Sequence, residues 1–162
     1  MKISIVYFSK TGKTELIAQM IAKSIESVSD TEVKLFQIDK IDNEFLNESC
    51  AVIFGTPTYY SNICWQLKKW FDESWTHDLG GKIGAAFVTA DYQQGGADIA
   101  ALTLIQHMMV KGMLAYSGGS SLGQPYTHLG VVAVNGNDTY NAELCSAFGK
   151  RIAEQAKSIF CR

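Results

Sequence analysis

The first 14 residues hold the feature that most constrains what this chain can fold into. An apolar, β-branched run from Ile3 to Phe8 stops abruptly, and an apolar pattern with helical spacing begins a few residues later. The loop between them reads Ser9, Lys10, Thr11, Gly12, Lys13 and Thr14. A strand that enters a helix through such a loop directs backbone N–H groups, hydroxyls and the positive end of the helix dipole at one point. The sequence therefore predicts a phosphate-binding loop at residues 9–14.

The rest of the chain alternates between apolar strands and helical patterns. Further strands are expected at residues 32–38, 50–55 and 82–89, and strand pieces at 113–117 and 130–134 flank a Gly- and Ser-rich insert, 118–129. Helices are expected at residues 63–75, 97–110 and 141–160, the last capped by Asp138 or Thr139. This alternation predicts an α/β fold with a parallel sheet of about five strands and helices on both faces, in one domain spanning residues 1–162.

The helical patterns also predict which side chains enter the core. The helix after the phosphate loop is expected to bury Leu16, Ile17, Met20, Ile21, Ile25 and Val28. Core positions are likewise expected for Trp70, Trp75 and Met108. For Trp65, packing in the core is favoured over stacking on a cofactor.

Composition excludes several classes of function. The net charge of −2 provides no basic field for nucleic acid or for an anionic membrane. No apolar run approaches the length of about 20 residues that a membrane span needs, and the chain enters its first strand directly, without a signal peptide pattern. The cysteines show no ligand-like spacing, so we expect reduced thiols, no metal site and a cytoplasmic location.

The tripeptide Gly-Lys-Thr at residues 12–14 also invites comparison with nucleotide triphosphatases. Their motif needs a further glycine five positions before its second glycine, and Tyr7 stands there in this chain. A strand ending in a magnesium-binding aspartate is missing as well, since Asp91 lies in a loop. The phosphate of a monoester, held by neutral hydroxyls, fits better. Lys10 and Lys13 have two possible roles, which the sequence does not separate. They either support the phosphate electrostatically or are solvated charges on the loop.

Two further loops follow the third and fourth predicted strands. In parallel sheets the ligand lies beyond the carboxyl ends of the strands, so these loops are expected to face the phosphate loop. The second loop contains Pro57, Thr58, Tyr59, Tyr60, Ser61 and Asn62. The third contains Thr89, Ala90, Asp91, Tyr92, Gly95 and Gly96. Their tyrosines offer flat apolar surface, and their hydroxyls and amides can bind the edge of a polar heterocycle.

A phosphate-monoester pocket beside aromatic loops is typical of a flavin mononucleotide (FMN) site. Residues 9–14 resemble the phosphate loop of the flavodoxin-like superfamily, and the resemblance covers essentially the whole chain. Residues 57–62 and the following helix are similar to NAD(P)H-dependent flavin and quinone reductases, including WrbA-type enzymes, whereas Asp91-Tyr92 is similar to electron-carrying flavodoxins. The resemblance implies a three-layer α/β/α sandwich with strand order 2-1-3-4-5, non-covalent FMN bound by the 18 residues of the three loops named above, and a homodimer or homotetramer.

The resemblance leaves two functions in competition. The first is an FMN-dependent oxidoreductase that reduces quinones or similar acceptors with NAD(P)H. The second is a non-enzymatic carrier that moves electrons between redox proteins. Because such carriers commonly present a strongly acidic surface, the low net charge favours the reductase. No catalytic residue is assigned, since the flavin carries the chemistry. Tyr126 and His128, in the insert, are expected to be exposed, with contact to the flavin edge or a partner subunit as the alternative.

Overall fold

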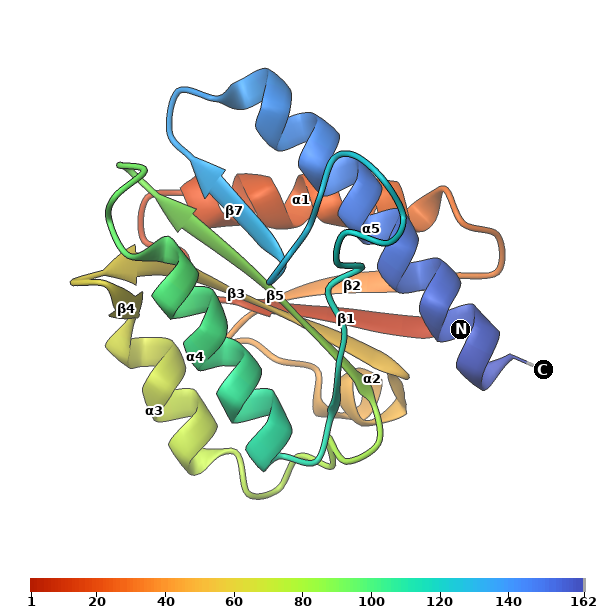
Figure 1. Cartoon of the computed structure of the whole chain (residues 1–162). Coiled ribbons are helices and arrows are strands. Elements are labelled where there is room, and N and C mark those ends of the chain that lie inside the picture. The colour runs from red at the N-terminus through yellow and green to blue at the C-terminus, as the bar shows by residue number, and fades with distance from the viewer. Residues whose placement is uncertain (162) are drawn as a thin grey trace.

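The computed structural model describes residues 1–161 and places a parallel sheet between two layers of helices (Figure 1). The strands are β1 (Lys2–Tyr7), β2 (Glu32–Gln37), β3 (Ala51–Tyr59), β4 (Asn62–Ile63), β5 (Ile83–Ala90), β6 (Leu114–Ala115) and β7 (Val131–Val134). The helices are α1 (Lys13–Glu26), α2 (Asn43–Glu48), α3 (Trp65–Glu73), α4 (Ala97–Val110) and α5 (Asp138–Phe160).

The strands form the sheet order that the family resemblance implies. The path runs β2-β1-β3-β5-β6, and β7 also pairs with β5. Both β6 and β7 run parallel to β5, so they are the two pieces of one interrupted fifth strand. Counting them as one strand gives the order 2-1-3-4-5, and the expected fold class is confirmed. The short β4 folds back antiparallel on the end of β3.

The central strands are buried on both faces, as parallel strands between helical layers must be. Alternate residues point to opposite layers: Ile5 and Ile53 pack with α1 and α5, whereas Val52 and Phe54 pack with α3 and α4. Figure 1 shows α1 and α5 on one face of the sheet and α3 and α4 on the other. No helix within residues 1–161 is both long enough and apolar enough to cross a membrane.

Two tryptophans lie outside the core, contrary to the prediction. The side chains of Trp65 and Trp75 are 68% and 86% exposed. Residues 62 and 63 pair with β3 as β4, so α3 begins only at Trp65, and it ends at Glu73, before Trp75 is reached. The helix predicted over residues 63–75 is therefore too long at both ends, and its spacing does not apply to Trp75. Met108 is fully buried as expected, and Trp70 is half-buried.

The start of α5 and the whole of α2 were also not predicted. Helix α2 is short, and the side chain of Asp42 caps it by accepting a hydrogen bond from the backbone N–H of Phe45 at 3.1 Å. Helix α5 begins at Asp138, with Asn137 in the capping position, so neither Asp138 nor Thr139 caps it. Asp138 instead lies in the first turn of the helix.

The insert at 118–129 is tied to α5 by one buried arginine. Arg151 is 9% exposed, and its guanidinium donates hydrogen bonds to the carbonyls of Pro125, Gly123 and Leu122 at 2.7, 2.9 and 3.2 Å. Buried donors and acceptors are costly to leave unpaired, so these hydrogen bonds hold the insert against α5.

Gly55 in β3 provides a test of how closely the central strands pack. A Cβ atom added at Gly55 would overlap the ring of Phe87 on β5. We expect Gly55→Ala to lower the free energy of unfolding by about 1–3 kcal/mol, because the ring or the strand must shift. Urea denaturation of the apoprotein measures this. In a Phe87→Leu background, which lacks the ring, Gly55→Ala should cost less stability than it does in the wild type. An unchanged stability of Gly55→Ala in the wild type would contradict the close packing of Gly55 against Phe87.

Candidate cofactor site

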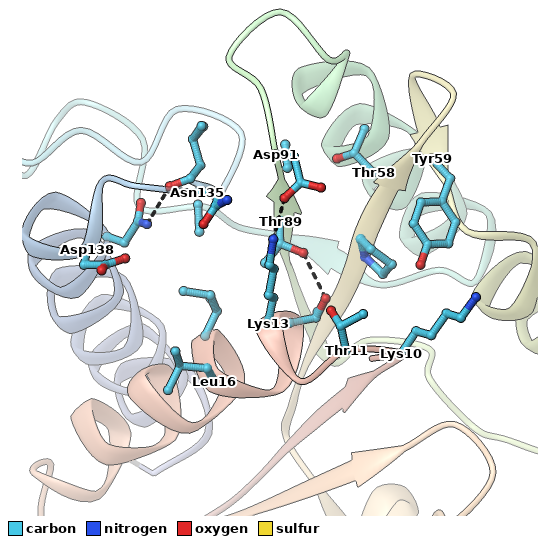
Figure 2. Close-up of a pocket in the computed structure, with 17 residues that line it drawn as sticks. Lys10, Thr11, Lys13, Leu16, Thr58, Tyr59, Thr89, Asp91, Asn135 and Asp138 are labelled. Carbon is cyan, nitrogen blue, oxygen red and sulfur yellow. Dashed lines mark hydrogen bonds and ion pairs between the residues drawn. The ribbon is translucent and has the colours of Figure 1, made fainter.

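The three predicted loops meet at one edge of the sheet. β1 and β5 each pair in parallel with β3, so all three strands end at the same side. A pocket of about 450 Å³ opens there, within the usual range of ligand pockets (Figure 2). Among the predicted site residues, those lining the pocket are Lys10, Thr11, Lys13, Thr14, Pro57, Thr58, Tyr59, Thr89, Ala90 and Asp91.

The phosphate loop is shaped by the start of α1. Gly12 caps the helix with φ at +87°, a left-handed conformation that favours glycine, and its carbonyl accepts the backbone N–H of Leu16 at 2.9 Å. The hydroxyl oxygen of Ser9 accepts the backbone N–H of Glu15 at 3.3 Å. Ser9 and Gly12 thus stabilise the conformation of the loop through hydrogen bonds to the first turn of α1, and they do not line the pocket themselves. The amino end of α1 is left facing the pocket, as an anion site requires.

A buried tyrosine supports the loop from below. The Tyr7 hydroxyl, at the end of β1, donates to the Glu15 carboxylate at 3.2 Å. Burial, together with the neighbouring charge of Glu15, raises the pKa of Tyr7 to about 12. Tyr7 therefore keeps its proton at neutral pH and can donate it to Glu15, which lies in the first turn of α1.

Two side-chain contacts join the first loop to the third. The hydroxyls of Thr14 and Thr89 lie 2.9 Å apart and are buried. Lys13 Nζ donates to Asp91 Oδ1 at 2.6 Å, and both side chains are about half exposed. Figure 2 shows this ion pair crossing the pocket between its two sides. Lys13 thus pairs with a carboxylate 78 residues away in the sequence, and its predicted contact with the phosphate remains a prediction.

The second loop provides the strongest sign that a ligand belongs here. The hydroxyl oxygen of Thr58 is buried and has no hydrogen-bond partner within the described chain. Buried polar atoms in folded proteins almost always have a partner, so an orphan that lines a pocket points to a bound group. The pyrimidine edge of a flavin carries N–H and C=O groups of the required kind, and the Tyr59 ring beside Thr58 supplies an aromatic surface. The residues present fit FMN.

Several predicted site residues do not line this pocket. They are Ser9, Gly12, Tyr60, Ser61, Asn62, Tyr92, Gly95 and Gly96. Asn62 accepts the N–H of Ile63 through its own side chain at 2.8 Å, and Gly96 caps α4 with φ at +82°. Tyr92 borders a second, smaller hollow beside the first. Their assignment to the cofactor remains a prediction from the sequence.

Other pocket residues were missed. They are Leu16, Ile17, Ala133, Val134, Asn135, Asp138 and Asn141. Leu16 was predicted to enter the core but is 52% exposed and lines the pocket. Asn135 follows β7, and the rule that ligands lie beyond strand carboxyl ends would have found it, had it been applied to the fifth strand as well. Tyr126 and His128 lie outside the pocket and are exposed, with their rings 5.7 Å apart.

Removing the unpartnered Thr58 hydroxyl should weaken FMN binding without destabilising the apoprotein. We expect Thr58→Val to weaken FMN binding about 3- to 10-fold through the lost hydrogen bond. The apoprotein should be equally or more stable, because the variant removes a buried unsatisfied group. Flavin fluorescence titration and thermal unfolding measure the two effects. Thr58→Ser keeps the hydroxyl and serves as control; an apoprotein destabilised by Thr58→Val, with unchanged affinity, would show that the hydroxyl is structural.

Comparison with known proteins places this geometry in one family. The flavodoxin family model matches residues 5–107. A flavodoxin from Clostridium saccharobutylicum is 53% identical over 160 residues, which cover 99% of this chain and all of that protein. A flavodoxin structure from the domain Archaea superposes with a TM-score of 0.80 at 25% identity, covering 97% of this chain and 99% of that one.

The prediction that the chain is chiefly a quinone reductase is wrong. A quinone oxidoreductase from Triphysaria versicolor is 34% identical over only 75% of this chain and 71% of its own length. Reductases are thus relatives, but the full-length match at 53% identity is to a flavodoxin. The alternative, electron transfer, has the better support, and the expected cofactor, FMN, is confirmed at the level of the family. From its sequence match and its pocket, this chain belongs to the flavodoxin family.

Proposed function

We propose that this chain is an electron carrier that binds FMN at the edge of its sheet and exchanges electrons with redox proteins. The observation that carries the proposal is the 53% identity to a flavodoxin along the whole of both chains. The pocket of about 450 Å³ and the orphan Thr58 hydroxyl support the cofactor's place. A cytoplasmic location remains part of the proposal and rests on the sequence argument alone.

Within this proposal the protein binds and orients, and bound FMN supplies the redox chemistry by accepting and releasing electrons. The amino end of α1 and the hydroxyls of Thr11 and Thr14 hold the phosphate. Pro57, Thr58 and Tyr59 hold the flavin edge from β3, and the chain after β5 closes the other side. The ion pair of Lys13 with Asp91 links the first and third loops.

The lining of the pocket suits electron transfer better than quinone reduction. Reducing a quinone to a hydroquinone takes a hydride and a proton, and a proton donor at the site can assist this step, whereas passing an electron to a redox protein delivers no proton to the acceptor. The residues that line the pocket in the described chain include no histidine and no cysteine, the side chains that most readily exchange protons near neutral pH. Asp91, one of the carboxylates there, is engaged by Lys13.

Anaerobic titration of the FMN-loaded protein tests the proposal. We expect NADH and NADPH to reduce the bound flavin no faster than they reduce free FMN, which serves as the control. A potentiometric titration should resolve two separate one-electron steps, because a carrier exchanges electrons singly. Rapid reduction by either nucleotide, followed by fast reoxidation with benzoquinone, would contradict the carrier and restore the reductase.

A further inference from the structure

The short strand β6 leaves one edge of the sheet open. Within residues 1–161, β6 pairs with β5 alone. Two backbone N–H groups join it there: Leu114 donates to the carbonyl of Lys82 and Tyr116 to that of Gly84, each at 2.8 Å. Because successive residues of a strand turn their backbone groups to opposite sides, the N–H and the carbonyl of Ala115 point away from β5. Both residues of β6 are exposed, so these groups are accessible.

The segment that contains this edge has no charged side chain. The chain has 14 lysines and arginines and 16 aspartates and glutamates, but none of them lies within residues 112–137. Soluble proteins usually protect an exposed edge strand from pairing by placing lysine, another charge or proline on it. The two residues of β6, Leu114 and Ala115, provide none of these. The edge is therefore open to pairing with another strand.

The insert at 118–129 does not cover this edge. Its far end folds back onto Ser117: the Thr127 hydroxyl donates to the Ser117 carbonyl at 2.5 Å, and the Ser117 hydroxyl donates to the carbonyl of His128 at 2.7 Å. Arg151 holds the middle of the insert against α5. Figure 1 shows the insert in teal beside α5, after the chain has left α4. The insert is thus fixed by its own contacts, and β6 stays exposed.

Apolar side chains lie next to the open edge. Met109 and Val110, at the end of α4, are 65% and 88% exposed, and Leu114 is 50% exposed. Helix α4 packs against β6, so the two sets belong to one surface. Lys111, the last charged residue before the uncharged segment, has a partner elsewhere: its Nζ donates to the carbonyl of Ser74 at 2.9 Å. Open backbone groups and apolar surface therefore occur together.

A second copy of this chain is the partner that fits such an edge. At a two-fold interface, residues near the axis meet their own counterparts, so a charge there would repel itself. An uncharged edge avoids this repulsion, whereas a partner with a charged face would lose water and gain no opposite charge. Two β6 strands related by a two-fold axis run antiparallel, and residues directly opposite each other can then exchange both backbone hydrogen bonds. Ala115 has both groups free to do so.

We propose that two copies of this chain associate through β6, with Ala115 opposite the same residue of the second copy and the two sheets joined into one. Met109, Val110 and Leu114 of each copy lose exposed surface in this contact, which adds apolar burial to the backbone hydrogen bonds. The strands of the two copies run in opposite directions, so the two cofactor sites lie at opposite ends of the dimer and stay open. The inference goes beyond the electron-carrier function and does not depend on it.

Sedimentation equilibrium of the FMN-loaded protein, from about 5 to about 500 µM, tests the association. A contact through one short strand is small, so we expect a reversible dimer with a Kd of about 10–200 µM. Raising the ionic strength from about 50 to about 500 mM should change this constant less than about twofold, because no charge lies at the contact. A protein that stays monomeric at the highest concentration would overturn the proposal, as would a dimer that salt dissociates.

Two variants of β6 test the place of the contact. Ala115→Pro removes the outward N–H and leaves the bonds to β5 intact, because proline is tolerated where the N–H faces solvent. Leu114→Lys adds a charge that meets its counterpart across the axis. We expect each to raise the Kd of the dimer at least about 10-fold, with FMN affinity unchanged as the sign of an intact fold. Ile159→Lys, at an exposed position on α5, is the matched control and should dimerise as the wild type.

Amide hydrogen exchange followed by NMR supplies a readout that needs no variant. The Ala115 N–H should exchange about two- to fourfold more slowly at about 500 µM than at about 20 µM, because a larger share of the protein is then dimeric. The N–H groups of Leu114 and Tyr116 are already bonded within the chain and should change less. A dimer in which exchange at Ala115 does not depend on concentration, or which Leu114→Lys leaves intact, has its interface elsewhere, and either result would overturn the proposal.

Discussion

The parallel register of β1, β3 and β5 is the constraint on which the site depends. Tyr7 of β1 lies opposite Gly55 of β3, which in turn lies opposite Phe87 of β5. With the strands aligned in this way, their carboxyl ends lie side by side, and the loops that leave them are forced together. The Thr14–Thr89 and Lys13–Asp91 contacts then join residues 75 and 78 positions apart. A slip of one residue in this register would exchange the two faces of a strand and misplace its loop.

Much of this arrangement is predictable because it follows from periodicity. The run from Ile3 to Phe8, the glycine at position 12 and the helical pattern after it specify strand, loop and helix in order. Continuous apolar strands predict burial on both faces, and alternation with helices predicts a parallel sheet between helical layers, whereas the strand order came from the resemblance to the flavodoxin-like superfamily. The orphan Thr58 hydroxyl could not be found this way, because it depends on the packing around β3.

The errors cluster where a local signal is absent or misleading. Tyr60 and Ser61 form a tight hairpin turn without the usual Asn-Gly, so β4 and the true start of α3 were not recognised. Leu16 fits the apolar face of α1 by spacing, but the helix begins at the pocket, and the exposed Leu16 lines this pocket while its neighbour Ile17 is buried in the core. In both cases the packing of distant segments decides which structure forms, and the spacing of apolar residues along the chain does not report that packing.

The functional error has a different origin. A net charge of −2 was taken to disfavour an electron carrier, on the assumption that carriers attract basic partners. Net charge does not report how charges are arranged. The ion pairs of Lys68 with Asp72 and of Lys69 with Glu73 along α3, and of Lys13 with Asp91 at the pocket, bring charges of opposite sign together. A low net charge therefore does not exclude an electron carrier.

The measurement that tests the account most directly is calorimetric titration of the apoprotein with FMN and with riboflavin, which lacks the phosphate. Both ligands offer the same ring to Thr58 and Tyr59, so the difference between them isolates the loop at residues 9–14. Because that loop combines a helix amino end with several hydroxyls, the account predicts that FMN binds at least about 100-fold more tightly. Equal affinities would contradict it, since the loop would then not hold the phosphate.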